Sequence, residues 1–81
     1  MLGSAMTVKE EHFEHKGIGC YVRIEELLRI GSEIFVYIWH VEVDDGRRRF
    51  ISESHGHFIT IARALEGGKT FAISAVEIMI G

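Results

Sequence analysis

Residues 34–43 read Ile-Phe-Val-Tyr-Ile-Trp-His-Val-Glu-Val, and this stretch decides the fold. Every residue in it is apolar, aromatic or β-branched except His40 and Glu42. Short apolar runs of this composition form strands more readily than helices. Because the beginning of the stretch is apolar on both faces, it predicts a central strand that is covered on each side.

The next four residues, Asp44-Asp45-Gly46-Arg47, predict a β-hairpin, because the type I′ turn favours Asp-Gly at its central positions. A two-residue loop predicts a third strand over residues 47–53. It pairs Asp44 with Arg47, Val43 with Arg48, Glu42 with Arg49 and Val41 with Phe50. In this register the sheet face that carries Glu42 and Arg49 is the more solvent-exposed one. The core face is then expected to carry Phe35, Tyr37, Trp39, Val41, Val43 and Phe50.

Residues 11–24 alternate in a way that predicts a first strand, with a bend or bulge at Gly17 and Gly19. One face is expected to carry Ile18, Cys20, Val22 and Ile24, and the other Phe13, His15, Tyr21 and Arg23. A helix over residues 7–16 is a competing interpretation with too few apolar residues for a buried stripe. Residues 1–7 are expected to be a disordered lead-in or tag remnant, and residues 25–30 a connector with at most one helical turn.

The C-terminal segment carries apolar or small residues at helical spacing, namely Ile61, Leu65, Gly68, Ala72, Ala75 and Met79. This stripe predicts one helix over residues 60–80, capped by Thr60. Two interior glycines, Gly67 and Gly68, cost about 2 kcal/mol relative to alanine, unless they permit close approach to the sheet. The alternative is a break there, giving a short helix and a fourth strand. The predicted fold class is α+β: a three-stranded antiparallel sheet packed on one long C-terminal helix.

Three short motifs add a resemblance. They are Phe-x-x-Lys-Gly at residues 13–17, Asp45-Gly46, and Ala-Leu-Glu at residues 64–66. Their order is similar to that of a loose group of short bacterial proteins of unassigned function. The resemblance implies three strands followed by a helix, and it implies no activity.

The 81 residues indicate a single domain with a small core. The only cysteine, Cys20, excludes an internal disulfide and indicates a reducing, cytoplasmic location. A small core without such a cross-link makes self-association attractive. The net charge of −3 argues against a general nucleic-acid binder, and no apolar run is long enough to cross a bilayer.

No known catalytic motif is present, and neither an enzymatic activity nor a cofactor is expected. Cys20 is interpreted as a core residue. His40, His55 and His57 form a weak candidate metal set, and His15 is expected near His40 on the outer face.

The strongest functional signal is the apolar character of the outer sheet face, which one helix cannot cover. The predicted interface, through which the protein would form a homodimer or bind another protein, consists of Phe13, Tyr21, Ile34, Val36, Ile38 and Ile51. The alternative is that the connector over residues 25–30 folds over this face through Leu27, Leu28 and Ile30. A different function, nucleic-acid binding, would use Arg47, Arg48 and Arg49, with aromatic residues of the sheet stacking on bases.

Overall fold

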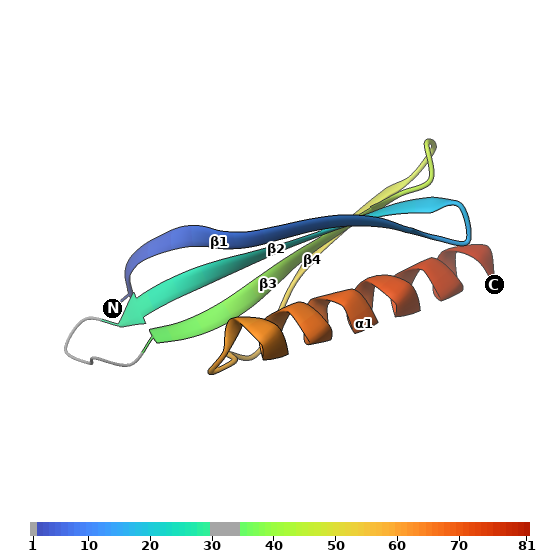
Figure 1. The fold of residues 1–81 in the computed structure, drawn as a ribbon. Coiled ribbons are helices and arrows are strands. Elements are labelled where there is room, and N and C mark those ends of the chain that lie inside the picture. The colour runs from blue at the N-terminus through green and yellow to red at the C-terminus, as the bar shows by residue number, and fades with distance from the viewer. Residues whose placement is uncertain (1, 30–34) are drawn as a thin grey trace.

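The computed structural model describes residues 2–29 and 35–81. A four-stranded antiparallel sheet, in the order β1-β2-β3-β4, packs against one C-terminal helix (Figure 1). The elements are β1 Leu2–His15, β2 Ile18–Arg29, β3 Phe35–Asp44, β4 Arg49–Glu53 and α1 Ile61–Ile80. The prediction of an antiparallel sheet on one long helix is confirmed, with four strands in place of three. In the described part of the chain, α1 is too polar to qualify as a bilayer-spanning helix.

The additional strand arises from a hairpin where the sequence predicted a bend. Lys16 and Gly17 have φ values of 52° and 80°, and His15 pairs with Ile18 across them. Positive φ at both turn positions is the type I′ geometry that joins two strands tightly. Across this turn, odd-numbered residues of β1 pair with even-numbered residues of β2, and paired residues lie on the same face of the sheet. Phe13 and His15 therefore lie on the face of Cys20 and Ile18. The prediction that Phe13 and His15 lie on the outer face is therefore wrong.

Both strands of this hairpin are longer than predicted. Residues 25–29 were predicted as a connector, but they belong to β2 and pair with both β1 and β3. This also overturns the prediction that residues 25–29 fold over the outer face, whereas Ile30 lies outside the described residues. Residues 2–7 were predicted to be a disordered lead-in or tag remnant, and the prediction of disorder is wrong, because they extend β1 beyond a register shift between Thr7 and Lys9.

The β3–β4 connection differs from the predicted two-residue loop. Asp44 pairs with Arg49, so the loop contains residues 45–48. The Asp45 carboxylate closes it by accepting from the backbone N–H groups of Arg47 at 2.8 Å and Arg48 at 2.7 Å. The register differs from the prediction by two residues, which returns each side chain to the same face. Trp39, Val41 and Val43 are accordingly buried on the helix side, as predicted.

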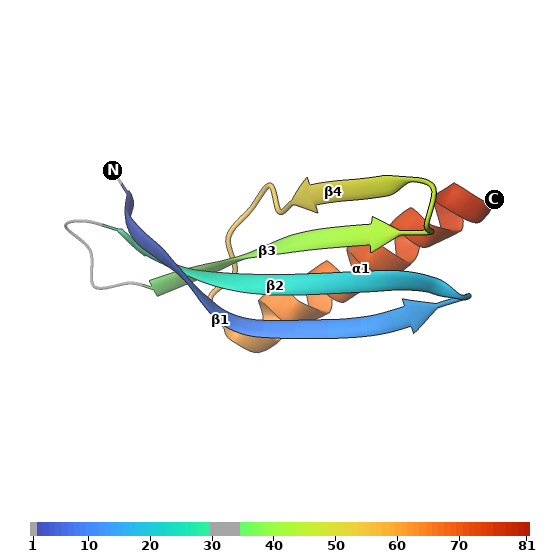
Figure 2. The same ribbon diagram turned by 90° about the horizontal axis from the view of Figure 1, so that it is seen from above.

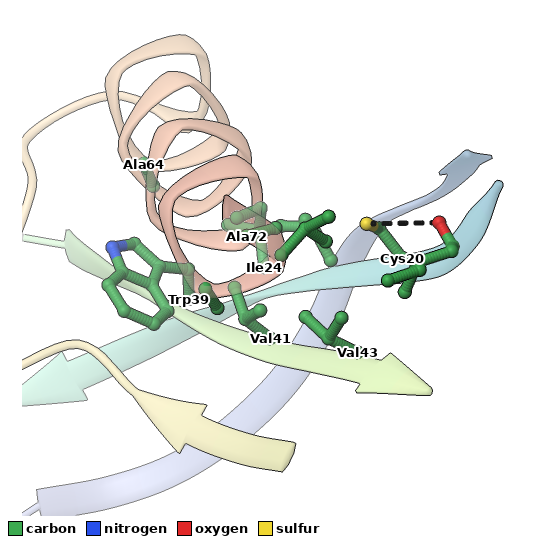
Figure 3. Packing of buried hydrophobic residues seen from close by; sticks show 11 residues of the cluster. Cys20, Ile24, Trp39, Val41, Val43, Ala64 and Ala72 are labelled. Atoms are coloured by element: carbon green, nitrogen blue, oxygen red, sulfur yellow. Dashed lines mark hydrogen bonds between the residues drawn. The ribbon is translucent and has the colours of Figure 1, made fainter. Parts of the chain in front are cut away.

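The core is a thin layer between α1 and one face of the sheet. Figure 3 shows Ile24, Trp39 and Val41 beneath Ala64 and Ala72 of the helix. α1 runs without interruption through Gly67 and Gly68, so the alternative with a break and a strand from this segment is wrong. Thr60 caps it as predicted, accepting from the Arg63 N–H at 3.1 Å.

Gly68 lies where the helix comes very close to the sheet. A Cβ atom placed on it would lie 2.7 Å from Val22 Cγ1 and 3.2 Å from Trp39 Cβ. Such distances are well inside ordinary carbon contact, so only glycine fits without a shift. Of the two glycines, Gly68 therefore permits the close packing that was predicted for the pair.

Candidate functional site

The outer face of the sheet is the surface opposite α1, and no described element covers it (Figures 1 and 2). The prediction that the central strand is covered on both sides is therefore wrong within the described residues. The strand registers place on this face the following residues: Glu10, His12, Glu14, Tyr21, Arg23, Glu25, Leu27, Val36, Ile38, His40, Glu42, Arg49, Ile51 and Glu53.

The predicted interface residues divide into three groups. Tyr21, Val36, Ile38 and Ile51 lie on the outer face, where Ile51 is 60% exposed. Phe13 lies on the helix side, with the Lys69 ammonium 5.7 Å from its ring centroid. Ile34 lies outside the described residues.

The apolar end of the outer face contains Leu27, which was predicted to belong to the connector over residues 25–30. Leu27 pairs with Val36, and Ile38 is the next outward residue along β3. Leu27 is buried, whereas Val36 and Ile38 are half-buried. The sequence could have placed Leu27 on the outer face, because it continues the alternation of Arg23 and Glu25 in β2. Interpreting residues 25–30 as a connector with a helical turn concealed this pattern. These three residues form what we call the apolar corner.

The centre of the outer face is a charged cluster around His40. Glu25 contacts His40 Nε2, and Glu53 Oε1 lies 3.3 Å from His40 Nδ1. Arg23 Nη2 donates to the same Glu25 oxygen at 3.3 Å. The side chains of His40 and Glu25 are only 16% and 17% exposed, so the strand neighbours already shield this cluster from water.

Two further carboxylates of the outer face, those of Glu42 and Glu10, also have partners. Arg49 donates to Glu42, its diagonal neighbour across the strands. The Tyr21 hydroxyl donates to Glu10, and this hydrogen bond raises the pKa of Tyr21 above its ordinary value. Local pairing lowers the cost of removing these charges from water.

A shallow hollow of about 630 Å³ opens on the same face above Gly19. Its rim carries the carboxylates of Glu14, Glu42 and Asp44, together with the rings of His12 and Tyr21, which are tilted against each other with centroids 4.6 Å apart. Sequence reasoning missed it, because its residues come from three strands whose pairing was not known. The hollow offers negative charge and an aromatic wall, which suit a positively charged side chain.

The candidate metal ligands do not converge. His55 and His57 are exposed in the loop after β4, and within residues 2–29 and 35–81 no three His, Cys, Asp or Glu side chains are arranged to hold a metal ion. The predicted approach of His15 to His40 is wrong, because His15 contacts Glu77 of α1 at 2.9 Å. Cys20 is 4% exposed, and burial raises the pKa of its thiol.

The arginine cluster is largely engaged within the molecule. Arg48 donates to the Met79 carbonyl at 3.0 Å and lies 3.5 Å from the Asp45 carboxylate. Arg49 is paired with Glu42. The predicted pair of Arg47 with Asp44 does not form in this register. Trp39 lies under the helix, as expected, so it provides no platform beside these arginines.

No protein-family model, curated protein or solved structure matches this chain.

Proposed function

We propose that this protein is a non-enzymatic interaction module that binds a second copy of itself through the outer face of its sheet. The observation that carries the proposal is the uncovered face itself, with Val36 and Ile38 half-buried and Ile51 exposed on it. An apolar surface on a sheet face that no described element covers is typical of an interface.

The composition of the outer face favours burial against another protein. Glu10, Glu25 and Glu42 each have a partner on the same face, so stacking two faces would bury these three carboxylates as pairs. Buried charges without partners are costly, whereas paired ones are tolerated. A two-fold stack also places the two apolar corners within a single continuous interface.

The dimensions are also suitable. The molecule measures 44 × 20 × 18 Å, so its broad face fits within a projected area of about 880 Å². A standard-size interface buries about 800 Å² on each partner, which one whole sheet face can supply. The second copy would add apolar burial to a small chain whose helix covers only one side of the sheet.

Sedimentation equilibrium of wild type and Val36→Lys tests the proposal. The substitution places an ammonium group in the apolar corner, and we expect the average mass in solution to fall by half. Thr70→Lys, on the exposed side of α1, is the matched control and should leave the mass unchanged. Circular dichroism verifies that each variant is folded. A wild type that sediments at the single-chain mass of 9.2 kDa, or a folded Val36→Lys that keeps the wild-type mass, would refute the proposal.

Nucleic-acid binding through Arg47, Arg48 and Arg49 is the alternative proposal, and it has less support. Acidic residues Glu42, Asp44 and Asp45 surround the three arginines, and they oppose the approach of phosphates. The alternative requires a gel shift with oligonucleotides at low salt that Arg48→Ala weakens. No shift under those conditions would eliminate it.

A further inference from the structure

β4 forms an edge of the sheet, with β3 as its only partner among the described strands. The hydrogen bonds at its two ends fix which of its backbone groups are used. Ser54 N donates to Trp39 O at 3.0 Å, and Asp45 N donates to Arg48 O at 3.2 Å. Because bonded and non-bonded pairs alternate in an antiparallel ladder, the even-numbered residues of β4 bond to β3. The N–H and C=O groups of Arg49, Ile51 and Glu53 therefore point into the open edge.

The sequence of this edge is self-complementary. In an antiparallel pair of β4 strands centred on Ile51, Arg49 of each copy lies opposite Glu53 of the other, and Ile51 lies opposite its counterpart. This register uses the outward backbone groups of all three residues. Arg49 and Glu53 contact Glu42 and His40 of their own chain, but their side chains are still 61% and 64% exposed, which leaves surface for cross-strand pairing.

We propose that two copies of the chain join their β4 edges antiparallel about a two-fold axis at Ile51, which fuses their sheets into one. This contact is separate from the stacking of outer faces, and the two can coexist. It also covers part of an apolar groove of about 130 Å³ beside β4. The groove is lined by Phe50, Phe71 and Ile78, and Ile78 is 81% exposed.

The opposite edge of the sheet is a poor alternative. β1 carries a register shift between Thr7 and Lys9, and charged residues such as Glu10 and Glu14 follow along the strand. Bulges and charges are devices that prevent edge pairing. β4 has opposite charges at its two ends and an exposed isoleucine at its centre, an arrangement that favours pairing with itself.

Charge reversal in the Val36→Lys background tests the edge contact independently of face stacking. With both contacts present the wild type is a tetramer, so the halved mass of this variant is that of a dimer joined through β4. Arg49→Glu or Glu53→Arg places like charges opposite each other, and each should raise the dimer Kd about tenfold or more. Combining both reversals restores opposite charges and should recover most of the affinity. A monomeric Val36→Lys background, or a double reversal no tighter than the singles, would overturn the proposal.

Cysteine cross-linking tests the register without Val36→Lys. Residues paired by hydrogen bonds across antiparallel strands have Cα atoms about 5.5 Å apart, within disulfide range. In a Cys20→Ala background, Ile51→Cys chains should therefore oxidise to covalent dimers. Glu53→Cys lies on the same strand and face, but it would be about 14 Å from its counterpart and should form no covalent dimer.

Mixing Arg49→Cys with Glu53→Cys chains should give the mixed dimer in preference to either self-dimer, as mass spectrometry can show. Equal rates for Ile51→Cys and Glu53→Cys, or self-dimers in place of the mixed one, would exclude this register. Failure of face stacking has a different signature, namely identical masses for wild type and Val36→Lys.

Discussion

Substituting Gly68 by alanine tests whether the closeness of α1 to the sheet depends on one missing methyl group. The added Cβ would lie 2.7 Å from Val22 Cγ1, and carbon atoms prefer separations of about 3.5–4.0 Å. Val22 has no exposed surface and cannot turn toward solvent. Helix and sheet must therefore separate locally by about 1 Å, which loosens the contacts of Trp39 with α1.

Two opposing effects determine the magnitude. Alanine gains about 1 kcal/mol over glycine in a helix interior, whereas overpacking a tight core costs about 1–3 kcal/mol. We expect Gly68→Ala to lower the free energy of unfolding by about 1 kcal/mol, which corresponds to about 4–8 °C in Tm for a domain of this size. Gly67→Ala is the matched control, because its Cβ would make longer contacts: it would lie 3.3 Å from Trp39 Nε1 and 3.1 Å from the edge of the half-buried Phe58 ring. That ring can yield, so Gly67→Ala should be neutral or stabilising.

Chemical denaturation at a fixed protein concentration measures both variants, since self-association contributes to the apparent stability. Val22→Ala removes the methyl group that the new Cβ would strike. The combined loss for Val22→Ala with Gly68→Ala should therefore be smaller than the sum of the single losses by about 1 kcal/mol. A Gly68→Ala variant as stable as Gly67→Ala, or strictly additive losses, would refute the argument that packing requires glycine at this position.

Further predictions concern the loop, the helix cap and the thiol. Backbone N–H groups of Arg48 and Arg47 lower the pKa of Asp45, so its contribution to stability is complete above its ordinary pKa and is lost as pH falls through the lowered one. The difference in unfolding free energy between wild type and Asp45→Ala should therefore shrink in acid, and a constant difference would contradict this. Thr60→Ala should cost about 1 kcal/mol in thermal unfolding, and an unchanged Tm would count against the cap. Cys20 should react with a thiol reagent only in denaturant, and rapid labelling of the native protein would disprove its burial.

The sequence predicted which residues of β3 face the helix, even though the hairpin register was wrong. A slip of two residues keeps every side chain on its original face, so the burial of Trp39 and Val41 did not depend on the turn. The helix was predictable for a different reason. Its apolar stripe continues through Gly67 and Gly68, and the tertiary contacts of Gly68 compensate for its low helix propensity.

The β1–β2 hairpin could not be recognised from alternation alone. Gly17 interrupts the alternation and predicted only a bend, because the dipeptide Lys16-Gly17 lacks the Asn or Asp typical of a type I′ turn. Treating the two strands as one placed Phe13 on the same face as Tyr21. The tight turn instead pairs Phe13 with Cys20, on the helix side. One unrecognised turn thus misplaced a predicted interface residue.

The same slip of two residues in the β3–β4 register has a larger consequence for the backbone than for the side chains. With the predicted two-residue loop, Arg49 and Ile51 would bond to β3, and the open edge would present Arg48, Phe50 and Ser52. Self-pairing centred on Phe50 would then oppose Arg48 to Ser52, with no complementary charge. In the observed register the open edge presents Arg49, Ile51 and Glu53. A register slip of two residues leaves each side chain on its original face of the sheet. It changes which residues of β4 bond to β3 and therefore which residues the open edge presents. A core can therefore be predicted correctly from a sequence whose edge contact is not predictable until the turn is known.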